Sequence, residues 1–315
     1  MLEIIPKNTN FDFVGKRFIW IGISIVLMVG TAILLMTKGL NYGIDFTGGA
    51  EVQLHFKKPV GIGELREKLE KGGFKNLLIQ QLGQASESDF LVKVSGDESE
   101  LQQIAGRTEQ SLLGAMSKDD FEIQRVDVVG PQAGGELRKS GFLALFYTLL
   151  CILIYVAVRF DYRYSPGAVL ALVHDSMLTL GIFVITQREF SLQIVAAILT
   201  VIGYSNNDTI IVYDRIRETI KAYPNRSFEE NVNRSINETL SRTILTSVTT
   251  LFVVTSLMLF GGGVIHDFAF TMFIGILVGT YSSIFIASPI LIAVTHFQEK
   301  RFRKSQNIAA RPNPA

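Results

Sequence analysis

The chain has 315 residues, of which 48% are hydrophobic and only 19% are charged, and its formal net charge is +1. A net charge this small provides no basic surface field of the kind that favours nucleic-acid binding. The single cysteine, Cys151, excludes a disulfide within the chain, so any domain outside a membrane must fold on its own core.

The apolar residues are gathered into six runs that contain almost no charge. These runs cover about 18–36, 141–158, 167–186, 191–213, 243–260 and 268–296. Each is long enough to cross a hydrocarbon core of ~30 Å, so the sequence predicts a membrane α-helical bundle of about six transmembrane helices. Lys16 and Arg17 precede the first run, which is longer than the apolar part of a signal peptide. We therefore interpret residues 1–37 as a cytoplasmic start and an uncleaved first helix.

The distribution of basic residues predicts the orientation. One side of the membrane carries nearly all basic residues near the short loops: Lys7, Lys16, Arg17, Arg159, Arg163, Arg215, Arg217, Lys221, Arg226, Arg234, Lys300, Arg301, Arg303 and Lys304. The short loops on the other side carry only Arg188. Because short cytoplasmic loops are enriched in Lys and Arg, both termini are predicted to be cytoplasmic.

Residues 38–138 are predicted to form one external domain between the first and second helices. Strand-like alternation occurs at Glu51–Phe56, Leu77–Leu82, Phe90–Val94 and Ile123–Val129, with a polar turn at 84–89. Apolar residues recur at helical spacing over Ile62–Lys71 and over 101–115. The order β-α-β-β-α-β is that of an α+β ferredoxin-like domain.

Residues 139–298 are predicted to hold transmembrane helices 2–6, with a charged cytoplasmic loop at 214–242. This loop is expected to be helical on both sides of Pro224, with Ser227 near the start of the second helix and acidic residues in its first turn. The tail at 299–315 is predicted to be cytoplasmic and disordered.

Asp208 is the most informative position, because it is an ionisable residue inside the fourth apolar run. It lies six residues before the charged boundary at Asp214, which corresponds to about 9 Å of helix. A charged, unpaired carboxyl there costs at least ~2.5 kcal/mol, so it should face the bundle interior or a water-filled path. Ser205 and Asn207 add polar groups beside it. We interpret Asp208 as a proton-binding carboxylate; the alternative is a structural polar contact between helices.

Three further residues are candidates for proton coupling. Arg242, at the start of the fifth run, is the expected partner of Asp208 and would act as a fixed positive charge. The alternative is an anchor whose side chain reaches the membrane surface. His174 and Asp175, inside the third run, form either a proton relay or a structural hydrogen-bonding pair. The four histidines are scattered without ligand spacing, so no metal site is predicted.

Two glycine-rich segments flank the predicted external domain and are interpreted as hinges or tight junctions. Their candidate residues are Gly43, Asp45, Gly48 and Gly49 on one side, and Gly130, Pro131, Gly134 and Gly135 on the other. A phosphate cradle is not indicated at the first segment, because neither a Lys nor a helix follows it. Two such junctions would let the domain move as a body.

The last apolar run contains small residues at a strict spacing of four: Gly275, Gly279, Ser283 and Ala287. This pattern permits close helix–helix approach. Packing inside the subunit is the expected use, and packing against a partner protein is the alternative. The sequence contains no Ser/His/Asp, Cys/His or nucleotide motif, so neither an enzyme nor a cofactor is predicted.

Taken together, several motifs resemble the SecF family of protein-export membrane proteins. They are GIDFTGG at 43–49, VGPQAGGELRKSG at 129–141, LVHDSMLTLGIF at 172–183, REFSLQIVAAILTVIGYS at 188–205, NDTIIVYDRIRE at 207–218, LSRTILTSVTTL at 240–251 and FGGGVIHDFAFTMFIGILVGTYSSIFIASP at 260–289. The resemblance covers nearly the whole chain except the interior of the external domain and the tail.

This resemblance implies an accessory subunit of the Sec protein translocase in the bacterial inner membrane. Members pair with SecD, are related to proton-driven RND transporters, and assist the SecYEG channel. They use the proton-motive force to promote late translocation and release of secreted chains on the outer side. The implied partners are SecD, SecYEG, YajC, YidC, the unfolded translocating polypeptide and membrane lipid. The family's intramembrane Asp and Arg fall on Asp208 and Arg242.

One residue departs from the family pattern. Asn206 stands where the family usually has an apolar residue, and an amide here would widen the polar path near Asp208. Two other functions compete with the implied one. An RND-like exporter of small molecules would need a larger external region than about a hundred residues. A passive scaffold of the translocase would keep full function when Asp208 is replaced by Asn.

Overall fold

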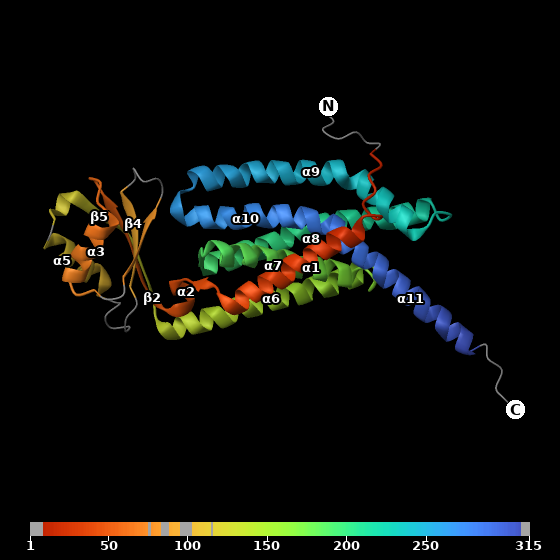
Figure 1. Cartoon of the computed structure of the whole chain (residues 1–315), viewed down its shortest axis with the longest axis horizontal. Coiled ribbons are helices and arrows are strands. Elements are labelled where there is room, and N and C mark those ends of the chain that lie inside the picture. Colours follow the sequence, from red (N-terminus) through yellow and green to blue (C-terminus); the bar gives the residue numbers. More distant parts are fainter. Residues whose placement is uncertain (1–8, 75–76, 83–87, 95–102, 115, 310–315) are drawn as a thin grey trace.

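The computed structural model describes residues 9–74, 77–82, 88–94, 103–114 and 116–309. They form two bodies arranged along the long axis of the molecule, a small sheet domain at one end and a helical bundle (Figure 1). The N-terminal segment and the last helix both begin or end far from the sheet domain. Both described ends of the chain therefore lie on the side of the bundle opposite the domain.

The sheet domain has the predicted ferredoxin-like order. Its elements are β2 (Gly49–Phe56), α3 (Ile62–Lys71), β3 (Leu78–Leu82), β4 (Asp89–Val94), α5 (Ile104–Leu113), a 3-10 turn (Lys118–Asp120) and β5 (Phe121–Val129). The strands are antiparallel in the order β3-β4-β2-β5. The predicted strands and helices each match one of these elements within three residues at either end, and the predicted turn at 84–89 lies mostly outside the described residues.

The two faces of this sheet differ because side chains alternate along each strand. One face packs against α3 and α5 and buries an apolar core that includes Leu54, Leu65, Phe90 and Leu112. The opposite face turns toward the bundle (Figure 1) and carries polar and charged side chains. The domain thus presents a charged surface, rather than an apolar one, to the membrane-embedded part.

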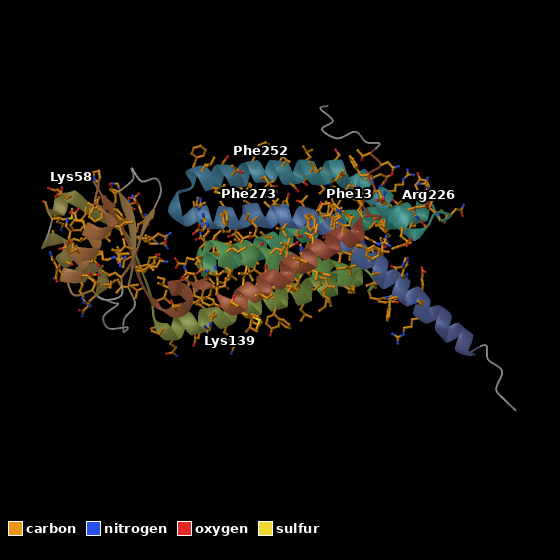
Figure 2. All side chains as sticks on the ribbon, viewed as in Figure 1. Phe13, Lys58, Lys139, Arg226, Phe252 and Phe273 are labelled. Carbon is orange, nitrogen blue, oxygen red and sulfur yellow. The ribbon has the colours of Figure 1, made fainter. Side chains whose placement is uncertain are left out.

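The bundle contains six helical spans long and apolar enough to cross a membrane, counted over the described residues. They are α1 (Arg17–Thr37), α6 (Pro131–Arg159), α7 (Ser165–Thr186), α8 (Leu192–Ala222), α9 (Phe228–Phe260), and α10 (Gly262–Ser282) continued by a π-helical turn (Ser283–Ala287) and α11 (Ser288–Ala309). The helices α7, α8 and α10 form the interior. Side chains such as Phe252 on α9 point away from the other helices (Figure 2).

The charged segment at 214–242 is a helical hairpin made by the ends of α8 and α9. Ser227 caps α9, because its hydroxyl accepts from the Glu230 N–H and the Glu230 carboxylate accepts from the Ser227 N–H. The N-terminal segment lies against this hairpin, where the Asn237 side chain accepts from the Phe11 N–H at 2.8 Å. Helix formation on both sides of Pro224 therefore agrees with the prediction.

Two boundaries differ from the predictions. The sheet ends at Val129 and α6 begins at Pro131, so residues 131–138 form the first turns of α6 and are not part of the sheet domain's own fold. Pro131 is well suited to the first turn, where its missing N–H has no partner to lose. The prediction of a disordered tail from residue 299 is wrong for residues 299–309, which continue α11.

Candidate functional site

Asp208 lies where three elements of the bundle meet. Its side chain is on α8 and is only 6% exposed. One carboxylate oxygen accepts from the Thr243 hydroxyl of α9 at 2.5 Å, and the other accepts from the Ser283 hydroxyl at the start of the π-helical turn, also at 2.5 Å. Hydroxyl donors satisfy a buried carboxylate without adding a second charge.

Arg242, the expected partner of Asp208, does not contact it directly; the next residue along α9, Thr243, does. Arg242 is exposed on the outer surface of its helix, while Thr243 points inward. No ion pair within 4.0 Å joins the described side chains of Asp208 and Arg242. Asn207 is likewise exposed on α8. Neighbouring residues on a helix diverge by about 100°, which explains both placements.

A second buried carboxylate, Asp175, lies on α7. It has no exposed surface, and one of its oxygens accepts from the hydroxyls of Ser205 at 2.6 Å and Ser282 at 2.7 Å. The other oxygen is 3.0 Å from Nδ1 of His174, which is also buried. His174 and Asp175 thus contact each other, and Asp175 also accepts hydrogen bonds from two other helices.

We call Asp175, Asp208, Ser205, Thr243, Ser282 and Ser283 the carboxylate cluster. Ser282 and Ser283 are consecutive residues, and each donates to a different carboxylate, so one short segment contacts both acids. Four residues that adjoin cluster members in the sequence carry buried polar atoms without a partner among the described residues: His174 Nε2, Tyr204 Oη, Asn206 Oδ1 and Thr209 Oγ1. In the sequence, Ser283 stands out only as one of the small residues of the last apolar run, and no pattern indicates that Ser283 or Thr243 binds Asp208.

The small residues of the last span allow the carboxylate cluster to be this tight. A side chain added at Gly275 would meet Val201 of α8 at 2.2 Å, and one added at Gly279 would meet Ser205 at 2.8 Å. Ala287 lies close to Gly167 of α7, and its carbonyl accepts from the Tyr213 hydroxyl at 3.1 Å. The structure therefore places this ladder against helices of the same chain.

The two glycine-rich segments pack directly against each other at the end of the bundle nearest the domain. A short helix, α2 (Ile44–Thr47), lies against the start of α6. Gly48 has a φ of +75°, and a Cβ there would lie 2.7 Å from the backbone of Pro131. A Cβ at Gly134 would lie 2.9 Å from the Gly48 nitrogen. Only glycine permits this approach of the two chains.

This region also contacts the start of α8. The Asp45 carboxylate accepts from the Leu192 N–H at 2.8 Å, so it caps α8 from a distant part of the chain. The strands β1 (Asn41–Tyr42) and β6 (Glu189–Phe190) pair in parallel beside it. We call α2 together with the N-terminal turns of α6 and α8 the external joint.

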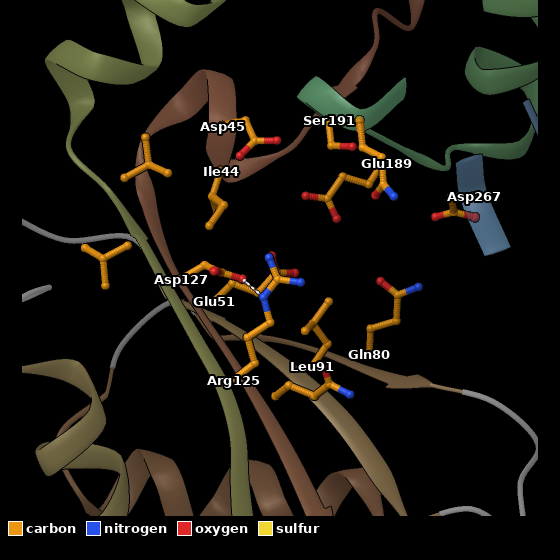
Figure 3. Close-up of a pocket in the computed structure, with 14 residues that line it drawn as sticks. Ile44, Asp45, Glu51, Gln80, Leu91, Arg125, Asp127, Glu189, Ser191 and Asp267 are labelled. Carbon is orange, nitrogen blue, oxygen red and sulfur yellow. Dashed lines mark ion pairs between the residues drawn. The ribbon is translucent and has the colours of Figure 1, made fainter. Parts of the chain in front are cut away.

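A charged cleft of about 500 Å³ separates the sheet from the external joint (Figure 3). Its lining includes five acidic residues, Asp45, Glu51, Asp127, Glu189 and Asp267, and one basic residue, Arg125. Beside it, Lys93 of β4 pairs with Glu51 of β2 at 3.5 Å and also with Glu189 of the bundle. Burial raises the pKa of the Glu51 carboxyl and lowers that of Lys93, although each partner opposes the effect on the other.

Metal ligation is not indicated by the arrangement. Within the described ranges there is no group of three or more His, Cys, Asp or Glu side chains that could hold a metal ion. The chemistry available to the carboxylate cluster is therefore that of carboxylates, hydroxyls and one imidazole, which can bind a proton and exchange hydrogen-bond partners.

Comparison with known proteins connects this geometry to a family. Residues 109–296 match the family described as "Protein export membrane protein SecD/SecF, C-terminal", and residues 33–60 match "SecD/SecF GG Motif". The chain is 45% identical over 302 residues to the protein translocase subunit SecF of Calditerrivibrio nitroreducens, covering 95% of this chain and 99% of the relative. It is 40% identical over 296 residues to that of Vibrio alginolyticus, covering 93% and 92%.

Two solved structures are also similar. A crystal structure of SecDF, a translocon-associated membrane protein from Thermus, has a TM-score of 0.81 and 38% identity over 93% of this chain. A second SecDF structure, described as the super-membrane-facing form, has a TM-score of 0.68 and 37% identity over 99% of this chain. The chain spans about two fifths of each SecDF chain, covering 40% and 41%.

The fold and the buried cluster define a multi-pass membrane protein with one ferredoxin-like domain, of the type associated with protein export. More narrowly, the chain belongs to the SecF family of protein translocase subunits. The predicted family, fold class and accessory role in the Sec translocase are confirmed by these matches. The RND-like exporter of small molecules is correspondingly disfavoured.

Proposed function

We propose that this chain, together with SecD, uses the proton-motive force to promote late translocation and release of secreted proteins on the outer side of the membrane. The observation that carries the proposal is Asp208, a carboxylate held inside a membrane-spanning helix by hydroxyl donors from two other helices. Such a group can gain and lose a proton, and each state requires a different hydrogen-bond pattern. Protonation then changes the packing of α8, α9 and the last span.

The helix α8 gives this change a path to the outside. Asp208 lies sixteen positions after Leu192, which corresponds to about 24 Å of helix. At Leu192, the N-terminal end of α8, the helix is capped by Asp45, which belongs to the segment that leads into the sheet domain. A shift of α8 would therefore act on the external joint and move the domain, which would hold the emerging polypeptide and resist its return.

The proposed orientation follows the basic residues. The end of the bundle opposite the sheet domain carries Arg159, Arg215 and Arg234, together with both described ends of the chain. Placing that end in the cytoplasm agrees with the enrichment of Lys and Arg in cytoplasmic loops. The membrane would be the bacterial inner membrane, with both termini cytoplasmic and the domain at 38–138 outside.

The proposed partners need separate surfaces. SecD would lie against α9, because the outward side of this helix combines apolar Phe252 with polar Arg242, Thr246 and Thr249, an unusual set for contact with lipid. The SecYEG channel, YajC and YidC would bind other surfaces of the complex. The polypeptide would contact the sheet domain.

Moving one charge through 100 mV supplies ~2.3 kcal/mol, so the free energy from a few protons would match that of a weak contact between the domain and the polypeptide.

The first test is the force-dependent completion of preprotein translocation in inverted membrane vesicles, comparing the wild type with Asp208→Asn. Asn keeps the shape of the side chain but binds no proton. We expect the stimulation by the proton-motive force to be lost while SecD still co-purifies with the variant. Undiminished stimulation with intact assembly would instead favour a passive scaffold or proton binding at His174 and Asp175.

A further inference from the structure

The π-helical turn at Ser283–Ala287 is held at both ends by α8. At one end, the Ser283 hydroxyl donates to the Asp208 carboxylate. At the other, the Ala287 carbonyl accepts from the buried Tyr213 hydroxyl. A π-helical turn is a rare irregularity that is often found at functional sites. Here it lies between two contacts with the same neighbouring helix, one of which is with the proposed proton carrier.

Ser283 has two acceptors but only one proton. Its hydroxyl lies 2.5 Å from the Asp208 carboxylate and 3.1 Å from the carbonyl of Thr280. When Asp208 is charged, the carboxylate is the stronger acceptor and takes the bond. When Asp208 is protonated, its own O–H needs an acceptor. The Ser283 oxygen can supply it, provided that the Ser283 proton rotates to the Thr280 carbonyl.

Ser282 has the same pair of options on the neighbouring site. Its hydroxyl is 2.7 Å from the Asp175 carboxylate and 3.1 Å from the carbonyl of Gly279. The two serines lie where α10 gives way to the π-helical turn. A change of partner at either serine therefore adds or removes a bond to a backbone carbonyl at the point where the helical hydrogen-bond pattern changes.

A third serine completes this arrangement. The Ser288 hydroxyl, which is fully buried, donates to the carbonyl of Ser283 at 3.0 Å. It thus satisfies a carbonyl at the start of the turn and supports the wide form of the helix. The backbone at Ser283 is held by Ser288, while its side chain is held by Asp208.

Building on the proposed proton coupling, we infer that Ser283 is the positioning residue that connects the protonation state of Asp208 to the hydrogen bonding of the π-helical turn. No proton leaves Asp208 in this step; only the Ser283 hydroxyl rotates. The turn then shifts against Tyr213 and changes the packing of the last span on α8.

The test uses Ser283→Ala, with Thr271→Val as the matched control. Thr271 is a fully buried hydroxyl of α10 that donates only to a carbonyl of its own helix, so its removal costs a hydroxyl without touching either carboxylate. Force-dependent stimulation of translocation should fall about tenfold in Ser283→Ala, as for a lost bond to a charged group, and change little in Thr271→Val. Ser283→Cys, which keeps a weak donor, should restore part of it.

Amide hydrogen exchange over 283–290 supplies a readout that a purely structural role of Ser283 would not change. It is measured on the complex with SecD at two pH values and corrected for intrinsic exchange rates. The charged and titratable groups near Asp208 are Arg242 on α9, whose positive charge acts on it without direct contact, and, through the serines, Asp175 and His174 on α7. We expect pH-dependent exchange in the wild type and Thr271→Val, and none in Asp208→Asn or Ser283→Ala.

The outcomes separate this inference from the function on which it rests. If Asp208→Asn keeps full stimulation, Asp208 is not the proton carrier, and both the proposed mechanism and the role of Ser283 that rests on it fail. If Asp208→Asn loses stimulation but Ser283→Ala keeps both stimulation and pH-dependent exchange, only the role of Ser283 is overturned. pH-dependent exchange that persists in Asp208→Asn would also overturn it, because Asp175 or His174 would then be the titrating group.

Discussion

At the scale of single residues, Glu51 shows how the interface between domain and bundle changes the behaviour of a charge. Its carboxylate is partly buried between the sheet and the external joint, with Lys93 as its ion-pair partner. Burial disfavours the charged form more strongly than Lys93 favours it, so the pKa of Glu51 is raised in the folded protein. The ionised carboxylate is therefore less favourable in the folded than in the unfolded chain.

This shift predicts a pH-dependent effect of Glu51→Gln. A raised folded pKa contributes stability that is present below the unfolded value and is lost as pH rises through the folded value. The variant is neutral at every pH and escapes that loss. We therefore expect its thermal midpoint to exceed that of the wild type by an amount that grows from pH 4 towards pH 7, measured by circular dichroism in detergent. A constant or shrinking difference would contradict the assignment.

Glu67→Gln provides the matched control for this series. Glu67 also pairs with a lysine, Lys71, but both side chains are well exposed, at 68% and 75%. An exposed ion pair on a helix contributes little to stability, because solvent and salt screen its charges. Its removal should therefore produce a small change of thermal midpoint, without the gain at rising pH that we expect for Glu51.

The sequence predicts the two carboxyls of the candidate site, because each is an ionisable residue inside an apolar run. Asp208 and Asp175 were selected because a carboxyl inside an apolar run needs a special environment. Their actual partners could not be predicted, because helix rotation decides whether Arg242 or Thr243 faces inward. Asp45 was recognised only as part of a glycine-rich junction. Its bond to Leu192 connects residues far apart in the chain, and no local pattern encodes it.

At the scale of elements, the contact between α2 and α6 depends on one glycine and not on its neighbour. A Cβ added at Gly134 would lie 2.9 Å from the Gly48 nitrogen, whereas one added at Gly135 meets no described atom within 4 Å. Both residues lie near the start of the same helix, at its fourth and fifth positions. The pair therefore separates the effect of close packing from that of helix propensity.

We predict opposite effects for alanine at these two positions. Gly134→Ala should destabilise the protein by about 1–3 kcal/mol, the usual cost of overpacking, because the backbone of the external joint must move. Gly135→Ala should be neutral or stabilise it by up to about 1 kcal/mol, since alanine favours helix more than glycine does. Thermal unfolding of both purified variants in the same detergent measures the difference. Equal effects would mean that the joint is not closely packed.

The elements themselves were largely predictable because their signals are local. Run length identified the six spans, and alternation and helical spacing identified the order of the sheet domain. The π-helical turn was not predictable. Gly275, Gly279, Ser283 and Ala287 recur every four residues, a spacing that fits an ordinary α-helix, whereas the wide turn coincides with contacts to α8 and α7 that no local pattern encodes. The prediction of a disordered tail is wrong for residues 299–309, because the helix continues beyond the apolar run.

At the scale of the whole molecule, the polar face of the sheet meets the bundle through a small number of charged contacts. Lys93 connects both bodies, since it pairs with Glu51 inside the domain and with Glu189 beside the external joint. Its side chain is only 13% exposed. Because the facing surfaces are polar and enclose a cleft, this contact can be broken without exposing an apolar core (Figure 3).

Lys93→Met should therefore loosen the domain from the bundle while leaving both folded. The change leaves Glu51 and Glu189 close together without the positive charge between them, and like charges at short range repel. Spin labels at Lys58→Cys on the domain and Lys139→Cys on α6, in a Cys151→Ser background, would report the separation of the two bodies. Both positions are exposed (Figure 2).

We expect the distance distribution between these labels to become broader and longer in Lys93→Met. Lys71→Met removes an exposed lysine of the same domain that contacts only its own helix, and it should leave the distribution unchanged. The double variant Lys93→Met with Glu189→Gln should narrow the distribution again, because the glutamine at position 189 has no charge to repel Glu51. An unchanged distribution in Lys93→Met would mean that the short backbone connections through the external joint, rather than this ion pair, fix the domain in place.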